Sequence, residues 1–231
     1  MSTLQADAAA GDDPALQVTA LIDSTHPLVQ AFAECHAQGA DARERAVALY
    51  LAVRDGFRYD PYRIDLTVAG MRASAVIEKG YGWCVTKAAL LAAACRATAI
   101  PARVAYADVR NHLSTERLRQ MLQTDVFLWH GWTEVQLDGR WIKATPAFNI
   151  ELTERFGLLP LAWDGREDSI YHPYDRAGQR HMEYLHQRGS FDDVPLDSIR
   201  ADFEHHYAAL LSRPALSQAA DFHAEAGAEA R

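Results

Sequence analysis

The stretch "EKGYGWCVTKAALLAAACRATAIPAR", residues 78–103, contains the pattern that decides the fold. From Cys84 onward it consists of good helix formers with few strongly polar positions. A helix that is apolar nearly all round is a buried, central one. Pro101 cannot continue a helix, and the β-branched and aromatic residues after it favour a strand. The sequence therefore predicts a buried helix followed by a strand.

Cys84 stands at the start of that helix, directly after the turn Tyr81-Gly82-Trp83, whereas Cys95 lies well inside it. A helix N-terminus presents unpaired N–H groups and a positive dipole end, which lower the pKa of a thiol. The backbone N–H of Cys84 is also free to donate to a developing oxyanion. Cys84 is therefore the candidate nucleophile. Trp83 is a candidate cleft wall or oxyanion donor, and Tyr81 a candidate wall, with core packing as the alternative for both.

A β-hairpin is the clearest structural prediction in the chain. Residues 125–148 read "DVFLWHGWTEVQLDGRWIKATPAF", and Asp138-Gly139 is a strong signal for a two-residue hairpin turn. Such a turn fixes the register, so that Leu137 faces Arg140.

Period-2 alternation places six residues on one face of the first strand: Val126, Leu128, His130, Trp132, Glu134 and Gln136. His130 lies on a rigid element among aromatic residues, which makes it the candidate base for Cys84. Its neighbour Trp129 is a further candidate for the substrate-binding wall. Thr145 falls on the face of His130, diagonally across the hairpin.

The rest of the chain predicts further helices. Residues 26–57 are helical, with Asp41 as an N-cap and Glu44 completing a capping box. A short helix over 72–80 ends at Gly80. Later in the chain we expect a second hairpin around Asp164-Gly165, and helices over residues 180–189 and 195–211.

The domain organisation that we expect is a single domain with two tails. Residues 1–16 form a flexible tail, residues 17–212 the domain, and residues 213–231 a tail that is disordered or a frayed helix. Within the domain, the core motifs occupy residues 79–149 and a C-terminal extension occupies residues 151–212.

Composition narrows the class of protein. The chain has 231 residues, of which 49% are hydrophobic and 23% charged, as in an ordinary globular protein. Its formal charge of −8 argues against nucleic acid or an anionic membrane as the partner, because a phosphate-binding surface needs clustered Lys and Arg.

The cysteines and the sequence motifs indicate where the protein is located and whether it binds a cofactor. Three cysteines do not make a disulfide framework, and neither they nor the histidines have metal-ligand spacing. No glycine-rich phosphate loop occurs, so we expect no metal and no cofactor. The N-terminus does not read as a signal peptide, and no apolar run reaches the roughly 18–20 residues of a membrane span. We therefore expect a cytoplasmic protein.

The order of these motifs resembles that of the transglutaminase-like superfamily. The matching features are Gly-Tyr-Gly-Trp-Cys, a buried helix, Arg-Ala-x-x-Ile-Pro-Ala-Arg, and then His-x-Trp-x-Glu-Val-x-Leu-Asp-Gly-Arg-Trp. The resemblance implies an α+β fold with a papain-like core, in which a central helix packs on an antiparallel sheet with additional helices. It also implies that Cys84 is the nucleophile and His130 its base, and that a thioester forms in reactions on amide or peptide bonds. The substrate would be a peptide, a protein or a small amide.

One departure from the family concerns the third catalytic residue. Family members usually have Asp in Trp-x-x-x-Asp-Pro, whereas here the segment from Trp141 to Pro146 has Thr145 in that place. A threonine hydroxyl can orient the His130 ring but cannot offset imidazolium charge, although papain-type enzymes work with a neutral Asn. Asn149 is the alternative third member.

The sequence leaves three functions open: a thiol-dependent hydrolase, an acyl transferase with the same dyad, and a non-catalytic module whose cleft binds a peptide or protein partner. It also leaves the oligomeric state open.

Overall fold

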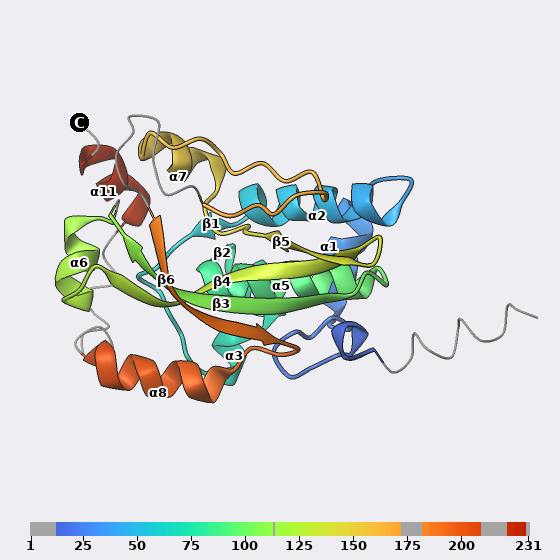
Figure 1. The fold of residues 1–231 in the computed structure, drawn as a ribbon, viewed down its shortest axis with the longest axis horizontal. Coiled ribbons are helices and arrows are strands. Elements are labelled where there is room, and N and C mark those ends of the chain that lie inside the picture. Colours follow the sequence, from blue (N-terminus) through green and yellow to red (C-terminus); the bar gives the residue numbers. More distant parts are fainter. Residues whose placement is uncertain (1–12, 113, 172–181, 209–220, 230–231) are drawn as a thin grey trace, which may run out of the picture.

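The computed structural model describes residues 13–112, 114–171, 182–208 and 221–229, and its fold is α+β. A four-stranded antiparallel sheet forms one layer, and a buried helix lies against it with further helices beyond (Figure 1). The predicted fold class is therefore confirmed. Of the two expected tails, residues 1–12, 213–220 and 230–231 lie outside the described part of the chain.

The helices are η1 (Pro14–Leu16), α1 (Pro27–His36), α2 (Ala42–Gly56), α3 (Val68–Met71), α4 (Ala73–Lys79), α5 (Cys84–Ala97), α6 (Glu116–Leu122), α7 (Ile150–Arg155), α8 (Leu196–His206) and α11 (Phe222–Glu229). The strands are β1 (Arg58–Tyr59), β2 (Tyr81–Gly82), β3 (Ala102–Asn111), β4 (Val126–Leu137), β5 (Arg140–Ala144) and β6 (Met182–Phe191). In the described part of the chain, no helix combines the length and the apolar character needed to cross a membrane.

The centre of the fold is α5, whose side chains are buried from Cys84 to Arg96. It packs against β3 and β4 on one side and against α1, α2 and α4 on the others. This burial on all sides is what its apolar, alanine-rich sequence predicts.

The C-terminus of α5 is closed by a Schellman motif that has alanine where glycine is usual. Ala99 has the left-handed φ of 59°. Its N–H donates to the Arg96 carbonyl at 3.0 Å, and the N–H of Ile100 donates to the Cys95 carbonyl at 2.9 Å. These bonds satisfy carbonyls that the end of a helix leaves open, at the cost of a strained alanine.

The main sheet has the strand order β5-β4-β3-β6, and each neighbouring pair is antiparallel. The predicted hairpin is present: Asp138 and Gly139 have φ of 51° and 75°, as a type I′ turn requires. Leu137 pairs with Arg140, as predicted. Asp41 caps α2 as predicted, since its carboxylate accepts the Glu44 N–H at 2.8 Å, but the Glu44 carboxylate accepts the N–H of Ala40, at 2.7 Å, in place of the Asp41 N–H that a capping box requires.

Two predictions for the C-terminal extension are wrong. Of the segment expected as a helix over residues 180–189, residues 180–181 lie outside the described part of the chain, and residues 182–189 belong to strand β6, which pairs with β3. Its hydrogen bonds go to a strand distant in the chain, and that pairing overrides local preference. The expected hairpin around Asp164-Gly165 is a loop, in which Asp164 accepts the N–H groups of Arg166 and Glu167. The helix expected over residues 195–211 is present as α8.

The described end of the chain also differs from the expected tail. Helix α11 packs onto the protein through Phe222, whose ring lies 5.7 Å from Tyr59 and 5.5 Å from Tyr62 between centroids. Glu225 accepts a hydrogen bond from the Tyr62 hydroxyl at 2.5 Å. The sequence of this helix has few apolar residues that would predict packing. It also gives no sign that Glu225 bonds a tyrosine distant in the chain.

Lys87 is a fully buried amine in the middle of the helical layer. Its Nζ donates to the carbonyls of Arg54 and Phe57 at the end of α2, both at 2.8 Å. Burial lowers the pKa of Lys87 to about 7. A neutral amine has two N–H groups for these two carbonyls, so Lys87 caps α2 with little need for charge.

Replacing Ala99 by glycine should stabilise the protein. Glycine adopts the left-handed conformation without the Cβ clash, so Ala99→Gly should raise the free energy of unfolding by about 0.5–1 kcal/mol. The matched control is Ala97→Gly, two residues earlier inside α5, which should lower it by about 1 kcal/mol. Urea denaturation measures both changes, and a loss of stability in Ala99→Gly would contradict the assigned end of the helix.

Candidate active site

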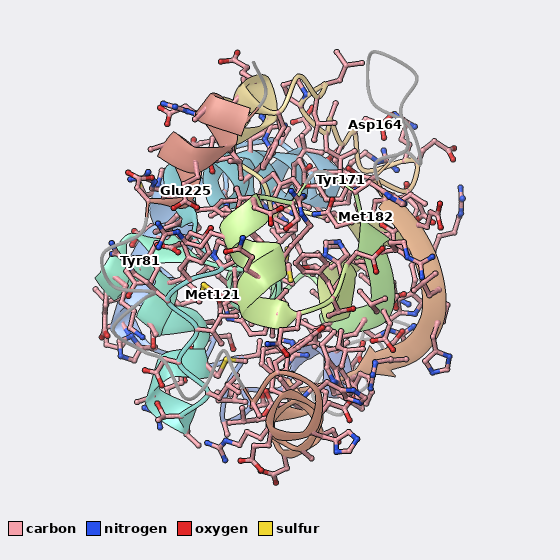
Figure 2. The ribbon with its side chains drawn as sticks, turned by 90° about the vertical axis from the view of Figure 1, so that its left-hand side faces the viewer. Tyr81, Met121, Asp164, Tyr171, Met182 and Glu225 are labelled. Carbon is pink, nitrogen blue, oxygen red and sulfur yellow. The ribbon has the colours of Figure 1, made fainter. Side chains whose placement is uncertain are left out.

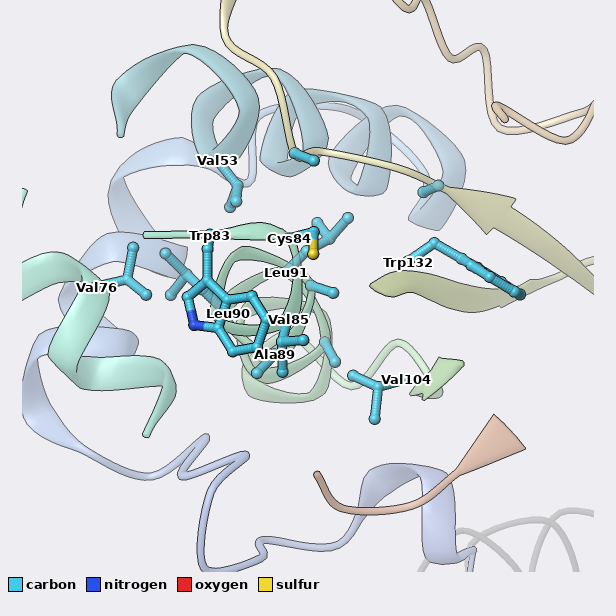
Figure 3. Close-up of a cluster of buried hydrophobic side chains, with 14 of the residues drawn as sticks. Val53, Val76, Trp83, Cys84, Val85, Ala89, Leu90, Leu91, Val104 and Trp132 are labelled. Carbon is cyan, nitrogen blue, oxygen red and sulfur yellow. The ribbon is translucent and has the colours of Figure 1, made fainter. Parts of the chain in front are cut away.

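Cys84 is the first residue of α5, and its side chain is only 6% exposed. Trp83 precedes the helix, and its backbone N–H donates to the Thr86 hydroxyl at 3.1 Å. In the view of Figure 3 the sulfur lies among the buried side chains, between Trp83 and Trp132. The sequence thus places the thiol at a helix N-terminus, as predicted.

Strand β4 approaches the first turn of α5 closely at Gly131. A Cβ atom at position 131 would lie 3.0 Å from the Tyr106 ring and 3.2 Å from the Cα atom of Val85. Glycine is therefore the residue that lets the strand lie against the helix start. On this strand the Cys84 thiol donates a long, weak hydrogen bond to the Trp129 carbonyl, with Sγ and oxygen 4.0 Å apart.

The electrostatics of Cys84 differ from the sequence-based expectation of a lowered pKa. Burial raises the pKa of the Cys84 thiol to about 11, although the backbone N–H groups of Gly131, Val85 and Cys84 itself act to lower it. In the helix interior, burial raises the pKa of Cys95 further, to about 12. At neutral pH the burial of Cys84 therefore favours the neutral thiol over the thiolate.

His130 is buried, at 5% exposure, among aromatic rings. Its ring centroid lies 6.0 Å from that of Tyr171 and 6.3 Å from that of Tyr184. Cys84 and His130 line the same pocket, so the structure brings the two predicted residues to one cavity.

A β-bulge directly precedes His130. Ala107 pairs with His130 and Val109 with Phe127, so two residues of β4 stand opposite Asp108 alone. The extra residue breaks the alternation that we predicted for this strand. As a result Phe127, which we expected on the opposite face, lines the same pocket as His130.

Trp129, one of the two bulge residues, has a left-handed φ of 61° and is held by a network of charged groups. Its backbone N–H donates to Asp108 at 3.2 Å and its indole N–H to Asp202 at 2.8 Å. The Arg188 guanidinium stacks over the indole at 4.2 Å and donates to both carboxylates, at 2.5 and 2.6 Å. These bonds offset the strain of an aromatic residue in a conformation that favours glycine.

The two candidates for the third catalytic position have other hydrogen-bond partners. The Thr145 hydroxyl donates to the Ser169 carbonyl at 2.7 Å. The Asn149 side-chain oxygen accepts the Tyr59 N–H at 3.2 Å. Both side chains are buried, and among the described residues that line the pocket neither is present.

The three residues predicted to form the substrate-binding wall lie in different parts of the structure. Trp83 lines the pocket, but Figure 3 shows the nitrogen edge of its indole turned away from the Cys84 sulfur, which favours a wall over an oxyanion donor. Trp129 packs outside the pocket, with its ring 5.5 Å from that of Tyr106. Tyr81 lies to one side of the molecule, under the guanidinium of Arg63 (Figure 2).

Sequence reasoning missed Gly131, Arg188 and Phe203, although all three contribute to the site. A lone glycine inside a strand pattern is a signal of close backbone approach, and it could have identified Gly131. No local pattern marked Arg188 or the pocket residue Phe203, because both come from distant segments. In the described part of the chain, no group of three or more His, Cys, Asp or Glu side chains is placed to hold a metal ion.

Comparison with known proteins gives two matches. The family model of the transglutaminase-like superfamily matches residues 30–146. The crystal structure of a "Putative Cysteine Protease" from Cytophaga hutchinsonii is 19% identical, with a TM-score of 0.48 over 79% of this chain and 48% of that one. The chain thus spans about half the length of that protein. Among curated proteins no match was found.

Alkylation of Cys84 should depend steeply on pH. Because its pKa is raised to about 11, the thiolate fraction, and with it the rate of reaction with iodoacetamide, should rise about tenfold per pH unit between pH 7 and 10. Peptide mass spectrometry of the native protein measures the rate, with the exposed Cys35 as the internal control that reacts faster at pH 7. A Cys84 rate that is constant from pH 6 to 9 and exceeds that of Cys35 would indicate a preformed thiolate instead.

Removing the guanidinium that holds Trp129 should loosen the bulge. Arg188→Met should increase amide hydrogen exchange at Leu128 and Trp129, because the left-handed backbone loses its charged partners. Arg103→Met is the matched control, since Arg103 also stacks on a tryptophan at 4.2 Å and bonds a carboxylate, but on another part of the sheet. Equal exchange at the bulge in both variants would show that Arg188 does not hold it.

Proposed function

The chain belongs to the transglutaminase-like superfamily, and on that premise we propose that it is a cysteine-dependent hydrolase or acyl transferase that acts through a thioester on Cys84. The observation that carries the proposal is that Cys84, at the N-terminus of α5, and His130, directly after the bulge of β4, line one pocket. The bond attacked is an amide or peptide bond.

Acylation begins with the neutral thiol. His130 accepts the thiol proton while the sulfur attacks the substrate carbonyl carbon, so that a C–S bond forms and the carbonyl oxygen becomes an oxyanion. When the intermediate collapses, the C–N bond breaks and His130 returns the proton to the leaving amine. Water then attacks the thioester, again with His130 as the base, and releases the acid and the free thiol. An amine in place of water gives acyl transfer.

The oxyanion has donors at the helix start. The backbone N–H groups of Cys84 and Val85 belong to the first turn of α5, where a helix leaves its N–H groups without an intrahelical acceptor. Both face the sulfur closely enough to act on the pKa of Cys84. They are positioned to stabilise negative charge as it develops beside that sulfur, together with the positive end of the helix dipole.

The uncharged third position suits this order of events. The Thr145 hydroxyl donates to Ser169 and the Asn149 side-chain oxygen accepts the Tyr59 N–H, so neither candidate brings a negative charge that would stabilise protonated His130. Together with the raised pKa of Cys84, this disfavours a resting thiolate–imidazolium pair. His130 therefore works as a neutral base during the attack, and we expect slower acylation than an Asp at position 145 would support.

The alternative function, a non-catalytic module that binds a peptide or protein partner, is favoured by one observation. Cys84 is buried, and its thiol has a pKa of about 11, as in a cysteine that only packs. Under this alternative Cys84→Ala retains the protein's binding function, whereas the enzyme loses its activity.

An activated ester separates the two functions. With p-nitrophenyl butyrate, the protein should release nitrophenol in a burst and carry a butyryl group on Cys84, which mass spectrometry detects. Cys84→Ala should abolish the burst, and His130→Gln should slow acylation about 100- to 1,000-fold, because the base is lost.

Cys95→Ala is the matched control for the thiol, since it removes a buried cysteine from the same helix and should keep the burst. Butyrylation of Cys84 that proceeds equally fast in His130→Gln would contradict the role of the histidine. The absence of any adduct on Cys84 would contradict the proposed enzyme and favour the non-catalytic binding module.

A further inference from the structure

The pocket beside Cys84 is apolar on nearly all sides. Besides the dyad and Trp83, its described walls include Leu118 and Leu122 of α6, Phe127 and Leu128 of β4, and Phe203 of α8. These walls come from segments far apart in the chain. One of them is α6, the helix nearest the viewer in Figure 2, on which Met121 is labelled. A well-formed apolar pocket next to a nucleophile is where the acyl group of a substrate would lie.

The described part of the lining has no side chain of the permanently charged types. None of the described residues that line the pocket is Asp, Glu, Lys or Arg. Arginines beside the lining residues are paired with carboxylates: Arg117 with Glu225 and Arg63 with Asp60. A charged acyl group would have to give up its hydration here without gaining a counter-ion, which costs several kcal/mol.

One hydrogen-bonding side chain in the wall, Tyr207, has its hydroxyl occupied by the protein itself. The Tyr207 hydroxyl, which lines the pocket, donates to the Val126 carbonyl at 2.7 Å and accepts the Leu128 N–H at 2.8 Å. It therefore contributes an aromatic surface to the pocket, and its polar end is committed to β4. An acyl group in this position is recognised by shape and by burial of apolar area.

The size of the pocket limits what fits. The cavity volume is about 540 Å³, including the part open to solvent. The enclosed part is smaller than this figure, which itself lies in the lower half of the range of small-molecule sites. A short aliphatic chain or one aromatic ring suits this volume.

From these observations we infer that the acyl donor for Cys84 carries an uncharged, apolar acyl group of short to medium length. The inference rests on the proposed function, since the same thiol forms the thioester. It separates this site from one that selects an acidic or a polar amide side chain. The apolar chain enters between α6 and β4, and the reacting carbonyl stays beside the start of α5.

A series of p-nitrophenyl esters tests the inference on the full-length protein. Acylation of Cys84 should become about fourfold faster with each added methylene from acetyl to hexanoyl, because each buries a further apolar increment. The glutaryl ester, which ends in a carboxylate, should react at least about tenfold more slowly than the pentanoyl ester of the same chain length. A flat profile, or a faster glutaryl ester, would overturn the inference and leave the proposed function standing.

A charge placed in the wall should change the preference. Leu128 is half-buried, and Leu128→Arg should raise the glutaryl rate relative to the pentanoyl rate by about tenfold. Leu185→Arg is the matched control, because Leu185 is an exposed leucine on β6 outside the lining. The same shift in both variants would overturn the assignment of the wall.

Ligand binding to a variant that cannot be acylated distinguishes failure of this inference from failure of the proposed function. In Cys84→Ala, which cannot be acylated, hexanamide should raise the melting temperature, and glutaramate, which is anionic, should not. Stabilisation by hexanamide together with no ester adduct on wild-type Cys84 would sink the proposed function while supporting the pocket. Equal stabilisation by both compounds, or by neither, would overturn the inference.

Discussion

The close contact between the first turn of α5 and strand β4 at Gly131 is the constraint on which the rest of the site depends. A side chain at this position would meet the Val85 backbone at 3.2 Å, so any other residue would push the strand away from the helix. Because Gly131 follows His130, the contact that lets the strand approach also sets the distance between histidine and thiol. Burial of α5 on all sides holds one half of this contact, and the bulge network around Trp129 holds the other.

The position of the thiol explains why its burial does not preclude chemistry. A cysteine with a pKa of about 11 is a poor nucleophile alone, yet it lies at a helix N-terminus and lines the same pocket as an imidazole. The burial that raises the pKa of the thiol comes from the same apolar surroundings that line the pocket. Under the function that we propose, these surroundings suit attack that is coupled to proton transfer.

The sequence predicted the turns, caps and helices that depend on residues close together in the chain. Asp138-Gly139 specifies its turn, Asp41 caps α2, and the alanine-rich run from Cys84 becomes the central helix. Cys84 and His130 could be paired as candidates because each lies on an element of this kind.

The rest depends on contacts between distant segments, which periodicity does not reveal. Residues 182–191 pair with β3 as a strand, and an inserted residue before His130 moves Phe127 into the pocket. Thr145 matches the family's third position in order, but the hydrogen bond of its hydroxyl to Ser169 was not foreseeable, because the chain returns there through a loop.

The juxtaposition of the Cys84 sulfur and a His130 nitrogen is the central claim, and a bifunctional alkylating agent measures it directly. 1,3-Dibromoacetone, which joins two nucleophiles through a three-carbon bridge, should link the two residues within one molecule and give a single cross-linked peptide by mass spectrometry. His130→Gln should abolish the link and leave Cys84 singly alkylated. Single alkylation of Cys84 in the wild-type protein, with no bridge to His130, would contradict the account.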